Sequence, residues 1–419
     1  MPDIVEVIMN INQLIENSEK SLTETFKKID SVALYNQEKV LSAFKRERIA
    51  LRHFAGTTGY GYDDIGRDTL GKLYADVFHT ESAIVSPLIA NGTHAISIAL
   101  FGLLRPGDIM YSISGDPYDT LMDVIGGNDM GSLKEYGVRF DKTELSSGDF
   151  DKQAIAEYLG KNSPKIIFIQ RSRGYSSRDA FTVEKLGDII SFVRQYNESA
   201  AIVVDNCYGE FVETREPTDV GADIVVGSLI KNPGGGLAPT GGYIAGKEDY
   251  VRLASYRLTC PGIGTEVGSY ISTYQYFYQG LFMAPHTVAQ TLKAAQLFCQ
   301  TFASLGYPVV PEAGKEYGDI IASIKFNTEK ELINFVQAIQ TTSPVDSFVV
   351  PEPWDMPGYN HKVIMAAGTF VQGASVEMSA DSPIRKPYIA YFQGALTYEH
   401  AKIALKACLE KNTVKWSSL

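Results

Sequence analysis

Two observations on this sequence predict an α/β fold with a mostly parallel central sheet. First, four short apolar runs rich in β-branched residues lie at 109–113, 165–170, 201–205 and 223–228, a pattern typical of strands buried on both faces. Second, stretches with helical periodicity separate these runs, at about 119–127, 151–160 and 182–196. Alternating strands and helices favour a parallel sheet with helices on both faces.

The predicted domain organisation has three parts. Residues 1–55 carry apolar positions at mixed three and four spacing with many charges between them, which indicates an N-terminal helical segment. Residues 56–300 contain the alternating pattern and are expected to form the large domain. From about 300 onward prolines interrupt the chain, and the final segment from about 397 has a helical pattern. Residues 301–419 are therefore expected to form a smaller C-terminal α+β domain.

Composition excludes several classes of partner. The 419 residues carry a formal net charge of -11, and an acidic surface disfavours nucleic acid and anionic lipid. Ser82 to Leu104 lacks charged residues, but the polar residues in its middle make a membrane span costly, so a buried strand, turn and helix fit better. Four widely spaced cysteines without a CxxC pair suit a reducing compartment, and a cytoplasmic location is expected. No histidine pattern indicates a metal site.

Polar residues end three of the buried strand runs. These are Gln170, Asp205 and Ser228. In open α/β sheets the ligand lies beyond the carboxyl ends of the strands, so we expect the three side chains to border one site.

Asp205 and Lys231 form the most specific combination. A buried aspartate needs a positive partner, and the protonated pyridine nitrogen of pyridoxal 5'-phosphate supplies one and keeps the ring an electron sink. Lys231 follows the next buried strand in Gly-Ser-Leu-Ile-Lys-Asn-Pro-Gly-Gly-Gly and is expected to hold that cofactor as a Schiff base. A capping aspartate and a solvated loop lysine are the alternative for each residue taken alone.

A phosphate site is predicted where Asn-Gly-Thr-His opens an apolar helical stretch. Gly92 and Thr93 would lie at the helix N-terminus, where free amides and the helix dipole attract anions. Ser228 would add a hydroxyl from a neighbouring strand end. An ordinary N-cap by Asn91 or Thr93 is the alternative.

Further candidates are one aromatic and several basic side chains. Tyr118 follows a strand and is expected to stack on the flat cofactor, although a packing role explains it nearly as well. Arginines suit bidentate carboxylate recognition, and Arg173 and Arg385 are the predicted binders of a substrate carboxylate. Arg171, Arg173 and Arg178 follow one strand closely, and at least one of the three is expected to be only an exposed loop residue.

At these residues the chain resembles the fold-type I pyridoxal-phosphate enzymes of cysteine and methionine metabolism. The segment Val-Gly-Ala-Asp-Ile-Val-Val-Gly-Ser-Leu-Ile-Lys-Asn at 220–232 is similar to their lysine motif. More closely, the chain resembles a bacterial branch of methionine gamma-lyase-like, cystathionine beta-lyase-like or "aluminium resistance" proteins. The segments that carry this likeness are 56–68, 170–175 and 370–381, and it covers nearly the whole chain.

The resemblance implies the fold-type I architecture, an activity and an assembly. It implies a lyase that breaks a carbon–sulfur bond of a sulfur-containing amino acid by β- or γ-elimination, in a homodimer or homotetramer with shared active sites. Transamination, or a non-catalytic cofactor-binding or regulatory role, are the alternatives. In the family a Tyr-x-Arg pair from a neighbouring subunit binds the phosphate. Here Tyr60 or Tyr62 matches the tyrosine, Asp64 stands where the arginine is expected, and Arg67 is a possible substitute.

The same resemblance assigns roles to residues already singled out by their positions. It matches Lys231 to the Schiff-base lysine and Asp205 to the pyridinium aspartate. Gly92, Thr93 and Ser228 match the phosphate cradle, and Tyr118 matches the ring-stacking tyrosine.

Overall fold

A seven-stranded sheet forms the centre of the computed structural model, which describes residues 4–176, 178–356 and 361–412. Its spatial order is β1-β7-β6-β5-β4-β2-β3, and β7 runs against the other strands. The strands are β1 (Ser82–Ser86), β2 (Ile109–Ser112), β3 (Arg139–Lys142), β4 (Ile166–Gln170), β5 (Ala201–Asp205), β6 (Ile224–Ser228) and β7 (Gly242–Gly246). The predicted mostly parallel sheet is confirmed.

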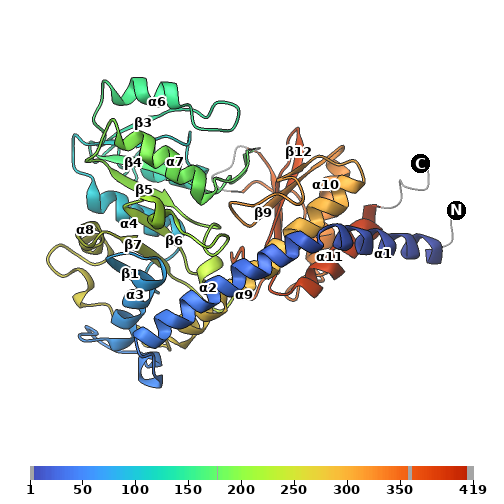
Figure 1. Cartoon of the computed structure of the whole chain (residues 1–419), viewed down its shortest axis with the longest axis horizontal. Coiled ribbons are helices and arrows are strands. Elements are labelled where there is room, and N and C mark those ends of the chain that lie inside the picture. The colour runs from blue at the N-terminus through green and yellow to red at the C-terminus, as the bar shows by residue number, and fades with distance from the viewer. Residues whose placement is uncertain (1–3, 177, 357–360, 413–419) are drawn as a thin grey trace.

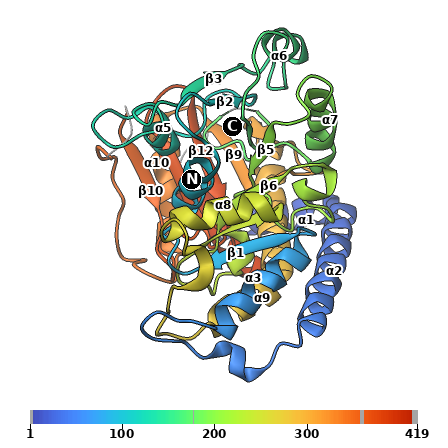
Figure 2. The same ribbon diagram turned by 90° about the vertical axis from the view of Figure 1, so that its left-hand side faces the viewer.

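Helices cover both faces of this sheet, as Figures 1 and 2 show. Successive strand residues point to opposite faces, so Ile167 and Ile169 of β4 belong to one buried apolar cluster, and Ile166 and Phe168 to another. The first face is covered by α3 (Ile65–Val77), α6 (Lys152–Leu159) and α7 (Val183–Arg194). The second is covered by α4 (Gly92–Leu103), α5 (Asp119–Gly126) and α8 (Glu248–Leu258).

A smaller antiparallel sheet follows in the C-terminal part of the chain, as predicted. Its order is β10-β11-β12-β9-β8. The elements are β8 (Val309–Val310), β9 (Ile321–Phe326), α10 (Glu329–Thr341), β10 (Val363–Ala366), β11 (Ser379–Pro383), β12 (Tyr388–Gln393) and α11 (Tyr398–Asn412). Helix α10 packs on this sheet and α11 packs on α10. The domain limits at residues 55 and 300 stay a prediction.

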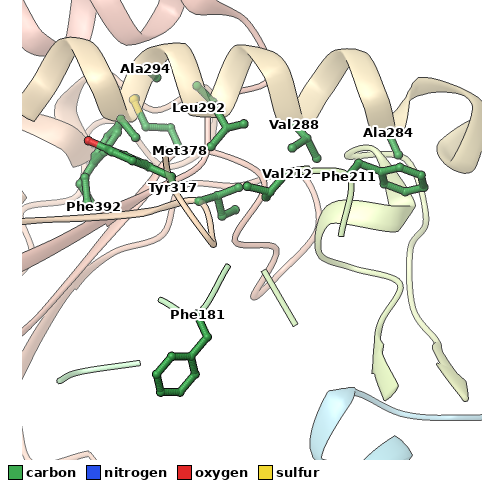
Figure 3. Close-up of a cluster of buried hydrophobic side chains, with 14 of the residues drawn as sticks. Phe181, Phe211, Val212, Ala284, Val288, Leu292, Ala294, Tyr317, Met378 and Phe392 are labelled. Atoms are coloured by element: carbon green, nitrogen blue, oxygen red, sulfur yellow. The ribbon is translucent and has the colours of Figure 1, made fainter. Parts of the chain in front are cut away.

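Three long helices connect the two parts (Figure 1). Helix α9 (Gln275–Ser304) contacts α2 (Thr23–Arg46) along its length, and α1 (Ile4–Ser21) packs against α9 and α11. Ala284, Val288 and Leu292 recur every four residues of α9 and therefore share one helix face. Figure 3 shows this face directed at side chains near each of the two sheets, among them Phe211 from the segment after β5 and Phe392 from β12. The two parts therefore share one apolar core.

In residues 4–176, 178–356 and 361–412 there is no helix long and apolar enough to cross a membrane. The same ranges hold no cluster of three or more His, Cys, Asp or Glu side chains arranged to bind a metal ion.

Candidate active site

A cavity of about 650 Å³ opens at the carboxyl ends of β4, β5 and β6. Residues of the small sheet, from β9, β11 and β12, line its opposite side. The cavity thus lies where ligands bind in open α/β sheets. Its lining brings together these residues predicted from the sequence: Gly92, Thr93, Tyr118, Gln170, Arg173, Asp205, Ser228, Lys231 and Arg385.

Asp205 and Lys231 both face this cavity. Asp205 is the last residue of β5 and is 4% exposed, and its Oδ1 accepts a hydrogen bond of 3.1 Å from the Cys207 backbone N–H. Burial raises the pKa of Asp205, and the positive charge of Lys231 opposes that shift. Lys231 follows β6 by three residues and is partly buried. The pair therefore places a buried carboxylate and an amine in one enclosure.

One end of the cavity offers unused hydrogen-bond donors. Helix α4 begins at Gly92, and Asn91 caps it by accepting a bond of 2.9 Å from the His94 backbone N–H. The first N–H groups of a helix lack intrahelical partners, so Gly92 and Thr93 present such groups here. The Ser228 hydroxyl is buried and has no hydrogen-bond partner in the described part of the chain. This combination suits an anion with several oxygens.

Tyr118 stands beside this donor cluster. Its hydroxyl lies 2.9 Å from the Thr93 hydroxyl, and its backbone N–H donates to Gln170 Oε1 at 3.0 Å. Burial raises the pKa of Tyr118, so the hydroxyl stays protonated near neutral pH. The residue is thus held through its hydroxyl and through its backbone, and its half-buried side chain lines the cavity, as a stacking surface must.

The three arginines after β4 are all buried, so the expectation of an exposed loop arginine is wrong. Arg171, Arg173 and Arg178 are 0%, 2% and 8% exposed. Arg178 Nη2 donates to the carbonyls of Gln170 at 2.9 Å and Ser172 at 2.6 Å. Arg171 Nη2 pairs with Glu213 at 2.7 Å. Backbone carbonyls and a carboxylate compensate the desolvation of these guanidinium groups. The partner of Arg171 is 42 residues away in the sequence, so the sequence gives no local sign of this contact.

Arg173 differs from the other two because part of its guanidinium is unpaired. Its Nη2 donates to the carbonyls of Val310 and Ile321, but the buried Nε and Nη1 have no partner among the described residues. Arg173 also lines the cavity. Arg385 reaches the same cavity from the loop after β11 and is exposed. The structure thus brings both predicted carboxylate binders to one cavity.

The chain matches one protein family over most of its length. Residues 11–413 match the family model described as methionine gamma-lyase. The chain belongs to the methionine gamma-lyase family. The resemblance inferred from the sequence is thereby confirmed.

Relatives with high similarity support this placement. The uncharacterized protein YnbB of Bacillus subtilis is 48% identical over 396 residues, 94% of each chain. The crystal structure of a carbon-sulfur lyase involved in aluminum resistance from Clostridium novyi NT has a TM-score of 0.93 at 49% identity and covers 96% of each chain. A Clostridium acetobutylicum protein, provisionally called a cystathionine beta-lyase involved in aluminum resistance, has a TM-score of 0.93 at 53% identity, with 96% of this chain and 95% of that chain covered.

Membership of the methionine gamma-lyase family brings fold-type I and the cofactor pyridoxal 5'-phosphate. The cavity residues fit that cofactor. The orphaned Ser228 hydroxyl and the Gly92 and Thr93 amides match a phosphate. A Cβ on Gly92 would lie 3.1 Å from Cys207 Sγ and 3.5 Å from Ser228 Cβ. The absence of a side chain at Gly92 therefore leaves space at the start of α4, where the phosphate would bind. Lys231 and Asp205 supply the amine and the carboxylate that the cofactor's aldehyde and ring nitrogen require.

Several lining residues were missed by the sequence analysis of this family member. Cys207 and Tyr208 follow Asp205 directly and line the cavity, so their position after the strand end was an available signal. Asp381 and Tyr391 come from paired positions of β11 and β12. Asp381 accepts a bond of 3.2 Å from Gln393 Nε2, and burial raises the pKa of Asp381 to about 6. Proximity in the sequence did not indicate these small-sheet residues.

The predicted tyrosine of the neighbouring-subunit motif lies elsewhere. Tyr62 is 63% exposed, stacks on Tyr60 with ring centroids 5.4 Å apart, and does not line the described cavity. Arg67, the possible substitute for the arginine of that motif, donates to the Gly61 carbonyl at 3.0 Å and pairs with Asp68 at 2.9 Å. Their role toward a phosphate stays a prediction.

Proposed function

We propose that this protein is a carbon–sulfur lyase that acts on a sulfur-containing amino acid by β- or γ-elimination. The observation that supports it most is the presence of Asp205, Lys231 and the orphaned Ser228 hydroxyl around one cavity in a methionine gamma-lyase family member. The printed descriptions of relatives as carbon-sulfur or cystathionine beta-lyases point the same way.

Each residue has a proposed task. When bound, the cofactor supplies an electron sink for the charge left on the substrate's α carbon. Lys231 would hold the cofactor through Nζ, and when that nitrogen is free it would remove the α proton of the substrate. Asp205 keeps a proton on the ring nitrogen. Ser228, Gly92 and Thr93 hold the phosphate, and Tyr118 supports the ring face.

Arginines complete the proposed substrate site. Arg173 has two unpaired buried nitrogens, and an unpaired buried cation is costly. A substrate carboxylate would give one of these nitrogens a charge-assisted hydrogen bond. Arg385, from the small domain, would approach the same carboxylate from the open side of the cavity. This arrangement selects amino acids over amines that lack a carboxylate.

We also propose self-association as a homodimer or homotetramer in the cytoplasm. Tyr60, Tyr62 and Ile271 expose 71%, 63% and 84% of their surfaces, and large exposed apolar side chains of this kind commonly mark protein contacts. The Tyr60–Tyr62 loop is the segment that the family resemblance assigns to a neighbouring subunit's site. The cysteines, all free in the described structure, suit a reducing compartment.

The test is an amino-acid panel assayed for 2-oxo acid, ammonia and thiol. A lyase releases all three from a thioether or thiol substrate, a transaminase releases no free ammonia, and a non-catalytic binder releases none. Lys231→Ala should abolish the visible band of the bound cofactor and all turnover while leaving the circular dichroism spectrum intact. Lys161→Ala, at an exposed position of the same domain, is the matched control. A panel without thiol release would overturn the proposal.

A further inference from the structure

The turn that follows Asp205 holds a tyrosine in a backbone conformation that side chains rarely adopt. The Gly209 backbone N–H donates to the Asn206 carbonyl at 2.9 Å, which makes Tyr208 the third residue of a β-turn. Its φ is 74°. A positive φ at this turn position is usually taken by glycine or asparagine. Strained residues of this kind cluster at functional sites, where the surrounding structure holds them in place.

Arg171 holds the turn and prevents it from relaxing. Its Nη1 donates to Asn206 Oδ1 at 2.8 Å and to the Gly209 carbonyl at 2.9 Å. A Cβ on Gly209 would lie 2.6 Å from Arg171 Cδ, so only glycine fits beside the guanidinium. The turn is therefore held in place, and Tyr208 lines the cavity beside Cys207.

The Tyr208 ring faces the amine of Lys231. The Nζ of Lys231 lies 4.0 Å from the centroid of that ring. This distance is well within the range over which the negative face of an aromatic ring attracts a cation. The Asp205 carboxylate also acts on Lys231, but under the proposed function it is engaged by the ring nitrogen of the cofactor. The tyrosine face then remains as a partner for the released amine.

We propose that Tyr208 is a positioning residue that holds the Lys231 ammonium over its ring whenever Lys231 is not joined to the cofactor. The inference rests on the proposed role of Lys231. It has a chemical consequence, because a ring that stabilises the ammonium also stabilises the proton on it. Lys231 must lose that proton before its neutral amine adds to the cofactor's aldehyde carbon and water leaves. Tyr208 thereby sets how readily Lys231 returns to the cofactor.

The electrostatic surroundings agree with this assignment. Desolvation by itself lowers the pKa of Lys231, but the acidic groups facing it outweigh that effect, and the pKa of Lys231 is raised. The groups that face or influence Lys231 come from the end of β5, the turn and the segment before α5, and they are Asp205, Cys207, Tyr208, Glu210 and Tyr118. Only an aromatic replacement at 208 preserves the geometry of the contact with Nζ.

The test follows cofactor uptake in place of turnover. Cofactor-free protein is mixed with pyridoxal 5'-phosphate at a series of pH values, and the rate of recovery of the visible band is measured. Tyr208→Asn removes the ring but tolerates a positive φ, and Tyr208→Phe keeps the ring. In Tyr208→Asn the pH midpoint of the rate should fall by about one unit, with uptake below the midpoint faster by about tenfold. Tyr208→Phe and the control Tyr196→Asn, at an exposed site, should keep the original midpoint.

An unchanged midpoint in a folded Tyr208→Asn protein would overturn the inference. Should that variant not fold, phenylalanines with increasing fluorination at position 208 keep the ring's shape but weaken its negative face, and the midpoint should fall stepwise along the series. A constant midpoint along the series would also overturn it. Recovery of the same band in cofactor-free Lys231→Ala would instead refute the role of Lys231 on which the inference rests, and so separates the two failures.

Discussion

Gly92 and Ser228 face each other at one end of the cavity, so close that a Cβ on Gly92 would lie 3.5 Å from the Ser228 Cβ. The Ser228 hydroxyl is buried and has no hydrogen-bond partner in the described structure. The Gly92 backbone N–H is the first of a helix and therefore has no intrahelical acceptor. A buried unpaired hydroxyl is destabilising. The relationship indicates a site whose hydrogen bonds are completed by a ligand.

Ser228→Ala should therefore have opposite effects on the cofactor-free and cofactor-bound protein. Without cofactor, removal of an unsatisfied hydroxyl should leave the thermal unfolding midpoint unchanged or raise it. With cofactor, loss of a charge-assisted hydrogen bond of about 1.5–3 kcal/mol should weaken pyridoxal 5'-phosphate binding by roughly 10–100-fold. Calorimetric unfolding and a binding titration measure the two effects. Unaltered cofactor affinity would place the phosphate elsewhere.

Asp205→Asn should retain the cofactor but react slowly. The amide oxygen can still accept the Cys207 backbone N–H bond, so the local turn is preserved. A neutral amide does not hold a proton on the ring nitrogen, and kcat should fall by about 10²–10⁴. Steady-state kinetics with the best substrate of the panel, alongside the visible spectrum, check this result. Near-normal kcat would contradict the proposed role of Asp205.

The two cavity arginines should give different responses to truncation. Arg385 is exposed, so Arg385→Ala should raise KM by roughly 10–100-fold and leave the thermal midpoint and the cofactor band unchanged. Arg173 also donates to the Val310 and Ile321 carbonyls, so Arg173→Ala should raise KM and lower the thermal midpoint as well. Kinetics and thermal melts on both variants separate these outcomes. An unchanged KM in both would locate the carboxylate at another side chain.

Asp381 predicts a pH dependence of stability. Burial raises its pKa from 3.8 to about 6 in the folded protein, so the folded state binds this proton more tightly than the unfolded state. The free energy of unfolding should consequently fall as pH rises from about 4 to about 6 through this group. Asp381→Asn should remove this component of the pH profile. Denaturant titrations across this range test it, and an identical slope in wild type and variant would contradict it.

The side of the cavity formed by the large sheet could be predicted from short stretches of sequence. The β-branched runs, the strand-terminal Asp205 and Ser228, Lys231 and the helix start at Gly92 are each set by a short stretch of chain. Parallel strands bring their carboxyl ends to the same sheet edge. Residues at or just after the carboxyl ends of these strands are therefore expected to lie close together, and the sequence suffices to predict this.

Tertiary structure decided the rest of the site. The burial of Arg171 and Arg173 depends on a carboxylate and on carbonyls from distant segments. Asp381 and Tyr391 reach the cavity only because the small sheet packs against the end of the large one through the core along α9. Tyr208 lies against Lys231, 23 residues away in the sequence, and Arg171 packs beside Gly209 of the same turn. Periodicity reports which face of an element is buried, whereas the partner across a cavity depends on how separate elements pack, and that is a property of the folded chain alone.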